Sequence, residues 1–113
     1  MGLSEFGRRA TKAVAKSKDI SEADVENPFV KYAKYRGCTA YKLRLIGLKG
    51  FPDRTVLCYG GRVFFVEFKK KGKKLSPTQL PIKHLLEKLG FKYYICDAIG
   101  QAEKHLDEVL GST

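Results

Sequence analysis

The sequence predicts an α/β domain in which a central mixed β-sheet is flanked by helices. The first observation is a Gly60-Gly61 pair between two runs of β-branched and aromatic residues, a strong signal for a β-hairpin. The second is a helical pattern and a further strand after the hairpin, because a strand-helix-strand succession favours a parallel crossover. The 113 residues are enough for one domain with a single core. The predicted order is α-β-β-β-α-β-α.

A basic segment over residues 1–20 opens the chain and contains little apolar content. Two interpretations of this segment stay open: a frayed, solvated arm, or an arm or short helix that touches phosphates. The domain proper is expected over residues 21–113.

The first helix is expected after Ser21, because Ser21 followed by Asp24 is typical of a helix start. Pro28 interrupts the pattern, so the helix either begins near Asn27 or is kinked at Pro28. Gly37 is expected at its end. Its apolar positions recur at three- and four-residue spacing and are Val25, Phe29, Val30 and Ala33.

Four strands are expected. The first covers 39–46 and is followed by a loop over 47–52, which contains two glycines and a proline. The hairpin strands cover 53–59 and 62–69. The last strand covers 91–96 and is expected to run parallel to a neighbour from the hairpin.

Two further helices are expected. Ser76 and Pro77 have the residue types of an N-cap and a first helical position, and the helix then runs to about Leu89. The final helix covers 99–110. The apolar faces are expected to be Leu80, Leu85, Leu86 and Leu89 in the first of these helices and Ala102, Leu106, Val109 and Leu110 in the second.

The composition favours a polyanion as partner. There are 22 Lys and Arg residues against 12 Asp and Glu, which gives a formal net charge of +10. A small protein this basic usually meets nucleic acid, and less often a ribosomal surface or an anionic membrane. No apolar run approaches the roughly 20 residues that span a bilayer, and no signal peptide is recognised. The three cysteines Cys38, Cys58 and Cys96 lack zinc-site spacing and are expected to be buried thiols, which favours the cytoplasm.

A few polar side chains in the hairpin are not explained by the apolar pattern. Glu67 and Lys69 project to the same face of a strand, with backbones roughly 7 Å apart. Burying an acid and a base in such an apolar run is costly without a ligand or partner. The carboxylates of Asp53 and Glu67, with a strand carbonyl, could hold one or two hard cations such as Mg²⁺ or Mn²⁺, which prefer oxygen ligands. Lys69 beside the metal could position the water or offset charge in the transition state. Each residue also has a structural interpretation: Asp53 could end a turn, and Glu67 with Lys69 could form a salt-bridge set on an exposed sheet. Taken together on so basic a protein, these residues favour a metal site.

The register of the hairpin sets a condition on this site. A two-residue turn at Gly60-Gly61 pairs Tyr59 with Arg62 and places Asp53 on the wrong face. A three-residue connection or a bulge pairs Tyr59 with Val63 and places Asp53 opposite Lys69. The site requires the second register.

The motifs in this region resemble a known family. Pro52-Asp53, thirteen intervening residues and Glu67-Phe68-Lys69 are similar to the PD-(D/E)XK nuclease signature. The runs 50–54, 60–69 and 74–79 more narrowly resemble the VRR-NUC family (virus-type replication-repair nucleases) over about residues 21–110. The resemblance implies a restriction-endonuclease-like core and is closest to the small stand-alone viral members. Some of those are homodimers that resolve Holliday junctions.

The resemblance also implies roles by position. Asp53 and Glu67 would be metal ligands, together with the backbone carbonyl of Phe68. Lys69 would be the catalytic lysine, and Gln79 the supporting glutamine of the following helix. The acid of the first helix, also a ligand, would be Glu26, with Glu22 as the competing choice.

DNA contacts are assigned to basic residues around this site. The run after Lys69 is too polar for a core, and phosphate contact is favoured over a solvated loop. The assigned residues are Lys49, Arg54, Lys70, Lys71, Lys73 and Lys74.

The function predicted from the sequence is that of a Mg²⁺- or Mn²⁺-dependent DNA endonuclease for branched DNA, with a role in DNA repair. We expect it to act as a Holliday-junction-resolving homodimer in the cytoplasm, or in the host cytoplasm if it is viral, without organic cofactor or membrane. Three alternatives stay open: a flap or strand-nicking nuclease, a non-catalytic module that binds structured DNA, and a small RNA-binding protein.

Overall fold

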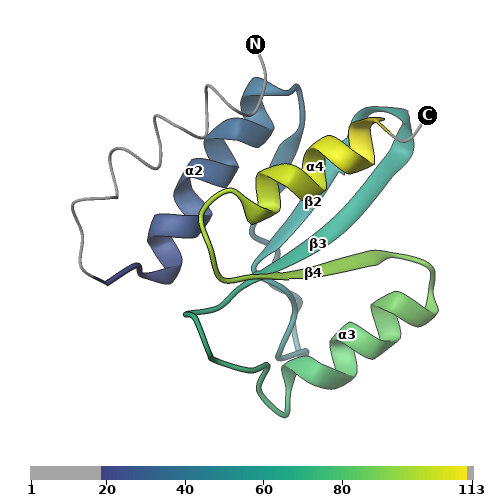
Figure 1. The fold of residues 1–113 in the computed structure, drawn as a ribbon. Coiled ribbons are helices and arrows are strands. Elements are labelled where there is room, and N and C mark those ends of the chain that lie inside the picture. The colour runs from purple at the N-terminus through teal and green to yellow at the C-terminus, as the bar shows by residue number, and fades with distance from the viewer. Residues whose placement is uncertain (1–18, 112–113) are drawn as a thin grey trace.

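The computed structural model describes residues 19–111, which form a four-stranded sheet with helices on both faces (Figure 1). The predicted order of elements is confirmed. Residues 1–18 of the predicted basic arm lie outside the described residues. The elements are α2 (Glu22–Tyr35), β1 (Thr39–Tyr41), β2 (Arg54–Cys58), the short 3₁₀ turn η1 (Tyr59–Gly61), β3 (Arg62–Phe68), α3 (Gln79–Lys88), β4 (Lys92–Cys96) and α4 (Gln101–Gly111).

The sheet is mixed and has the strand order β1-β2-β3-β4. β1, β2 and β3 are antiparallel neighbours, whereas β4 runs parallel to β3, as predicted. α2 and α4 cover one face and α3 covers the other, beside β4 (Figure 1). The larger part of the core lies under α2 and α4, and a smaller cluster lies under α3.

α2 begins where the sequence places it. The Ser21 hydroxyl accepts a hydrogen bond from the Asp24 backbone N–H, while the Asp24 carboxylate accepts one from the Ser21 N–H. This capping box satisfies two of the backbone donors that a helix start leaves open. The helix runs through Pro28, so the alternative start near Asn27 is wrong. Its buried residues are Val25, Phe29, Tyr32 and Ala33.

The register of the hairpin differs from both registers considered above. Cys58 pairs with Arg62 and Arg54 pairs with Val66, because Tyr59 belongs to the turn and not to the strand. Continuing this register by one residue places Asp53 opposite Glu67, two positions from the expected partner Lys69. Side chains two positions apart share a face, so Asp53 still reaches the face that the site requires.

The first strand is shorter than predicted. β1 ends at Tyr41, and residues 42–50 form a segment without helix or strand. Alternating apolar and basic residues in this segment resemble a strand in sequence, but they have no neighbouring strand to pair with in the described structure.

α3 buries a different face from the one predicted. Ile82 and Leu86 are buried, whereas the predicted core residues Leu80, Leu85 and Leu89 are exposed. The helix proper begins at Gln79 and is preceded by a turn in which the Ser76 carbonyl accepts hydrogen bonds from the N–H groups of the first two helical residues. Ile82 and Leu86 pack in one small cluster with Phe65 of β3 and Tyr93 of β4, so a narrow apolar stripe on the helix is enough.

The last helix and the cysteines agree with the predictions. In α4, Ala102, Leu106 and Leu110 are buried and Val109 is half-buried. Cys38, Cys58 and Cys96 are buried free thiols. Within residues 19–111, no helix is long and apolar enough to cross a membrane.

Glu103 of α4 is an unusual member of the core. It has no exposed surface, and neither carboxylate oxygen has a hydrogen-bond partner. Burial raises the pKa of Glu103 to about 7. A carboxyl with a raised pKa contributes its full stability below the unfolded pKa near 4.5, and that contribution is lost as the pH rises through about 7.

We therefore expect Glu103→Gln to be more stable than the wild type at pH 8 and to differ little from it at pH 5. A shift of this size corresponds to at most about 3 kcal/mol. Urea unfolding of both proteins at the two pH values measures the difference. Glu87→Gln, at an exposed acid of α3, is the control and should leave the pH dependence of the wild type between pH 5 and 8 unchanged. Equal losses of stability in wild type and Glu103→Gln between pH 5 and 8 would contradict this assignment.

Candidate active site

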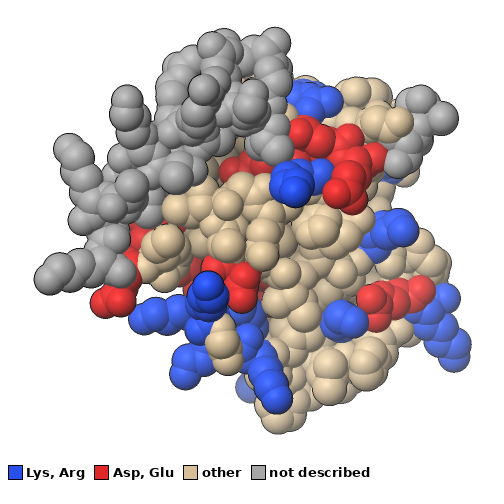
Figure 2. All heavy atoms as spheres, viewed as in Figure 1, with Lys and Arg blue, Asp and Glu red and all other residues tan. Residues whose placement is uncertain are grey.

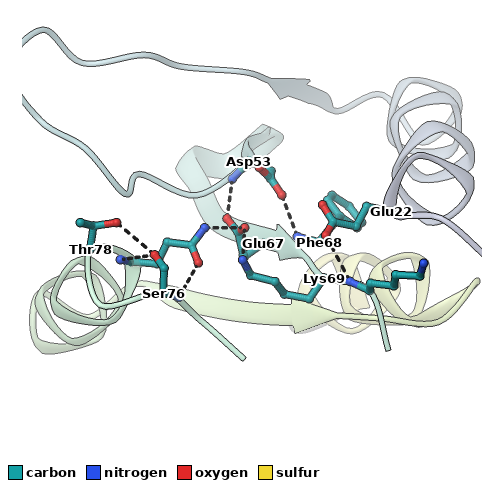
Figure 3. Close-up of polar contacts among 9 residues, drawn as sticks. Glu22, Asp53, Glu67, Phe68, Lys69, Ser76 and Thr78 are labelled. Atoms are coloured by element: carbon teal, nitrogen blue, oxygen red, sulfur yellow. Dashed lines mark hydrogen bonds and ion pairs between the residues drawn. The ribbon is translucent and has the colours of Figure 1, made fainter. Parts of the chain in front are cut away.

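Two carboxylates face each other where β2 begins and β3 ends (Figure 3). The Asp53 backbone N–H donates to Glu67 Oε1 at 3.1 Å, and the Phe68 N–H donates to Asp53 Oδ2 at 2.9 Å. Each carboxylate is thus oriented by the backbone of the opposite strand. The pairing of the strands, and not side-chain packing alone, fixes the distance between the two acids.

Both acids are held away from water. Glu67 is 2% exposed and Asp53 is half-buried. Burial, followed by the charge of Asp53, raises the pKa of Glu67 to about 7. Burial also raises the pKa of Asp53, and the charges of Glu26 and Glu22 act in the same direction. A cation between the two carboxylates would favour their ionised forms, because its charge offsets both the burial and the repulsion between them.

Lys69 and Gln79 complete this cluster, as the sequence predicts. Lys69 Nζ lies 3.6 Å from Glu67 Oε2, and Gln79 Nε2 donates to the same oxygen at 2.9 Å. Gln79 is itself fixed, because its Oε1 accepts the Ser76 N–H at 2.9 Å and its own N–H donates to the Ser76 hydroxyl at 3.2 Å. The turn before α3 therefore positions the glutamine against β3.

The two candidate acids of α2 lie near this cluster but have other partners. Glu26 Oε2 accepts a hydrogen bond from Arg54 Nε at 2.7 Å and lies 3.8 Å from Lys42 Nζ. Glu22, which is exposed, accepts the backbone N–H of Lys70 at 3.3 Å. Both raise the pKa of Asp53 through their charge, so both are within electrostatic reach of the site.

The predicted DNA-contacting residues fall into two groups. Lys49, Lys70, Lys71, Lys73 and Lys74 are exposed. Figure 2 shows Lys and Arg side chains gathered at the lower left of the view, over the segment between β3 and α3. Arg54 differs, because its guanidinium binds Glu26 and also donates to the Ala40 carbonyl at 3.0 Å. The guanidinium of Arg54 therefore binds groups within the protein, unlike the exposed lysines.

Sequence reasoning missed three residues near the site. Lys42 and Arg44 line a pocket beside Asp53, and their apparent position in a strand concealed this. Tyr93 of β4 is buried, and its hydroxyl has no hydrogen-bond partner. Burial raises the pKa of Tyr93, and the charges of Glu67 and Asp53 act in the same direction. The alternation of β4 could have identified Tyr93, since it shares a row of the sheet with Phe65.

The donor set for a metal ion consists of few protein groups. Among residues 19–111, no cluster of three or more His, Cys, Asp or Glu side chains has the spacing of a metal site. The groups available are the carboxylates of Asp53 and Glu67 and the carbonyl of Phe68. Mg²⁺ is usually held by one or two carboxylates and keeps several waters, so this set fits it.

A mixed sheet that carries an Asp, a Glu-x-Lys and a supporting Gln at one end has the core of a PD-(D/E)XK-like nuclease. A solved structure described as a VRR_NUC domain matches the fold with a TM-score of 0.61 and 31% identity, over 73% of this chain and 94% of that chain. "Putative nuclease p44" of Acyrthosiphon pisum secondary endosymbiont phage 1 is 35% identical over 79 residues, which are 70% of this chain and 85% of that protein. The chain belongs to the VRR-NUC family and is a nuclease. No family model matches the sequence.

The repulsion between the two acids leads to a prediction about stability. We expect Asp53→Asn to unfold at a higher urea concentration than the wild type at pH 8 in EDTA, by about 1 kcal/mol, because it removes one of two facing charges. The amide oxygen can still accept the Phe68 N–H. Asp97→Asn, outside the cluster, is the matched control. A destabilised Asp53→Asn protein would show that the two charges are already balanced by the surrounding cations.

Proposed function

We propose that this nuclease is a metal-dependent DNA endonuclease that cleaves branched DNA as a homodimer, in the cytoplasm of a host cell. The observation that carries the proposal is the pair of facing carboxylates, the half-buried Asp53 and the buried Glu67, with Lys69 beside Glu67. A protein that only binds DNA has no need of two acids where phosphates approach, since they repel the backbone. The pair is useful when a cation lies between protein and phosphate.

Asp53, Glu67 and the Phe68 carbonyl would hold Mg²⁺ or Mn²⁺. When bound, such an ion polarises the phosphodiester and lowers the pKa of a coordinated water. Glu26 could join through a water molecule, but its bond to Arg54 makes it a weaker ligand than Asp53 or Glu67.

Lys69 and Gln79 have distinct tasks in this proposal. The Lys69 ammonium lies close enough to Glu67 to point at the same substrate atoms, where it would offset the charge that develops on the phosphate oxygens. Gln79 donates to Glu67 Oε2 while the Asp53 N–H donates to Oε1, so the two bonds together fix the orientation of the carboxylate that would meet the metal ion. Its role is to position Glu67, and no contact with DNA is required.

The basic segment after β3 would contact the DNA backbone. Lys70, Lys71, Lys73 and Lys74 follow Lys69 directly and are exposed, and Lys49 is exposed and lines the same pocket as Asp53. Phosphate contacts of this kind position a duplex without reading its sequence. Arg54 is left out of the interface, since its bond to Glu26 holds α2 to the hairpin.

The homodimer is proposed because two symmetric cuts in a junction need two sites, and each chain has one such cluster among its described residues. The sequence favours an interface formed by the aromatic residues of the first helix, Phe29, Tyr32 and Tyr35, or by the hairpin. Phe29 and Tyr32 are fully buried and only Tyr35 of these three is exposed, which favours the hairpin. Tyr41 and Leu57 are exposed on the sheet face that carries Glu67, on the half of that face opposite β4. A second copy packing there would keep both active sites on one side of the assembly.

The catalytic proposal predicts that Glu67→Gln cleaves no junction DNA in Mg²⁺ or Mn²⁺ while its DNA affinity stays near that of the wild type. Lys69→Met should lose about 100- to 1,000-fold in cleavage rate, the size expected for one group that stabilises transition-state charge. Lys88→Met, an exposed lysine at the far end of α3, is the control and should cleave normally. Metal-independent cleavage, or normal cleavage by Glu67→Gln, would contradict the proposed metal site, whereas binding of junction DNA by the wild type without any cleavage would favour a binding module.

The dimer proposal predicts twice the mass of one chain in light scattering at micromolar concentration. The double variant Tyr41→Lys, Leu57→Lys should be monomeric, because two charges at a pairing face repel their copies. Leu85→Lys, at an equally exposed leucine of α3, should stay dimeric. A wild-type monomer, with or without junction DNA, would favour flap cleavage or strand nicking.

A further inference from the structure

A pocket of about 430 Å³ opens beside Asp53, and none of the lysines that follow Lys69 lines it. Its walls come from residues 42–49, the segment that follows β1, and its floor from Gly50 to Asp53. The volume lies in the range of pockets that hold a small organic ligand, about 300–1,000 Å³. One end of the pocket is therefore formed by a residue of the proposed active site itself.

The floor of the pocket is rigidly held. Gly50 has a φ of +89°, and a Cβ at this position would collide with the Thr78 backbone carbonyl. Phe51 packs edge-to-face on Phe65 at 5.5 Å between ring centroids. The segment is thus fixed against both the start of α3 and the centre of β3, so the pocket keeps a constant position relative to Asp53.

The walls combine two kinds of side chain. Leu43, Leu45 and Leu48 are 43%, 44% and 42% exposed, large fractions for leucines that line a pocket. Lys42, Arg44 and Lys49 stand between and beside them. Apolar walls suit the faces of a nucleobase, and cations at the rim suit the phosphates on either side of it.

We propose that the pocket receives one unpaired nucleotide next to the cleaved phosphate. The inference rests on the proposed function and adds the feature of the DNA that is recognised. A paired and stacked base has to leave the duplex before it can enter a pocket, and this is least costly where the base is already unpaired. Branch points, flaps and splayed arms offer such a base, whereas a continuous duplex does not.

The test compares two DNAs of the same sequence, a continuous duplex and one with a single unpaired 2-aminopurine at a branch. With the full chain in EDTA, we expect about tenfold tighter binding of the branched DNA and a rise in 2-aminopurine fluorescence as the base leaves its stacked neighbours. Leu45→Glu should reduce the preference to less than twofold and abolish the rise. Leu89→Glu, an exposed leucine at the far end of α3, is the matched control and should retain both.

Two results would overturn the inference: equal affinity of the wild type for both DNAs, or an unchanged preference in Leu45→Glu. If Leu45→Glu becomes monomeric in light scattering and keeps its preference, the pocket holds a second copy and not a base. Cleavage of both DNAs by the wild type in Mg²⁺ is measured in parallel. If the wild type cleaves DNA but shows no preference for the branched DNA, only the inference about the pocket is refuted. If the wild type cleaves neither DNA, the proposed function is refuted.

Discussion

The reciprocal hydrogen bonds between Asp53 and the end of β3 are the constraint on which the site depends. Two carboxylates of like charge would separate if their side chains were free to choose. Here each is tied to a backbone N–H of the opposite strand, so separating them would disrupt the end of the hairpin. The hydrogen bonds of the sheet thereby keep two repelling groups together. The repulsion between the two carboxylates is greatest when no cation lies near them.

Some basic side chains form ion pairs within the protein, and others are exposed to solvent. Arg54 neutralises Glu26 and holds α2 against β1, while Lys69 lies against Glu67. The four lysines of residues 70–74 are exposed, and this stretch contains no Asp or Glu. The segment after β3 is thus positively charged. A polyanion is therefore attracted to the region where the acids alone would repel it.

Much of the fold and the site could be predicted from the sequence, because the signals are local. The Gly60-Gly61 pair identifies the hairpin, and the spacing of Glu67 and Lys69 on one strand fixes their common face. The Ser-Pro start of the next segment places Gln79 in a first turn. Each of these depends on backbone geometry over a few residues, which neighbouring elements do not override.

The parts that sequence could not predict depend on long-range partners. Whether Tyr59 belongs to a strand or to a turn changes the register by two residues, and both choices satisfy the apolar pattern. The leucine pattern of α3 does not reveal that Ile82 and Leu86 are its buried residues, because that depends on where the helix lies against the sheet. Likewise, nothing near Glu26 in the sequence indicates that its partner is an arginine 28 residues later.

The close approach of Gly50 to Thr78 has a consequence for how this protein can diverge. Gly50 lies against the start of α3, whereas the preceding residues 42–49 are all exposed. Insertions or deletions between 42 and 49 can reshape the rim of the pocket without displacing Asp53, because loop closure tolerates changes of length. Substrate preference and cleavage chemistry can thus evolve separately in adjacent stretches of one short chain.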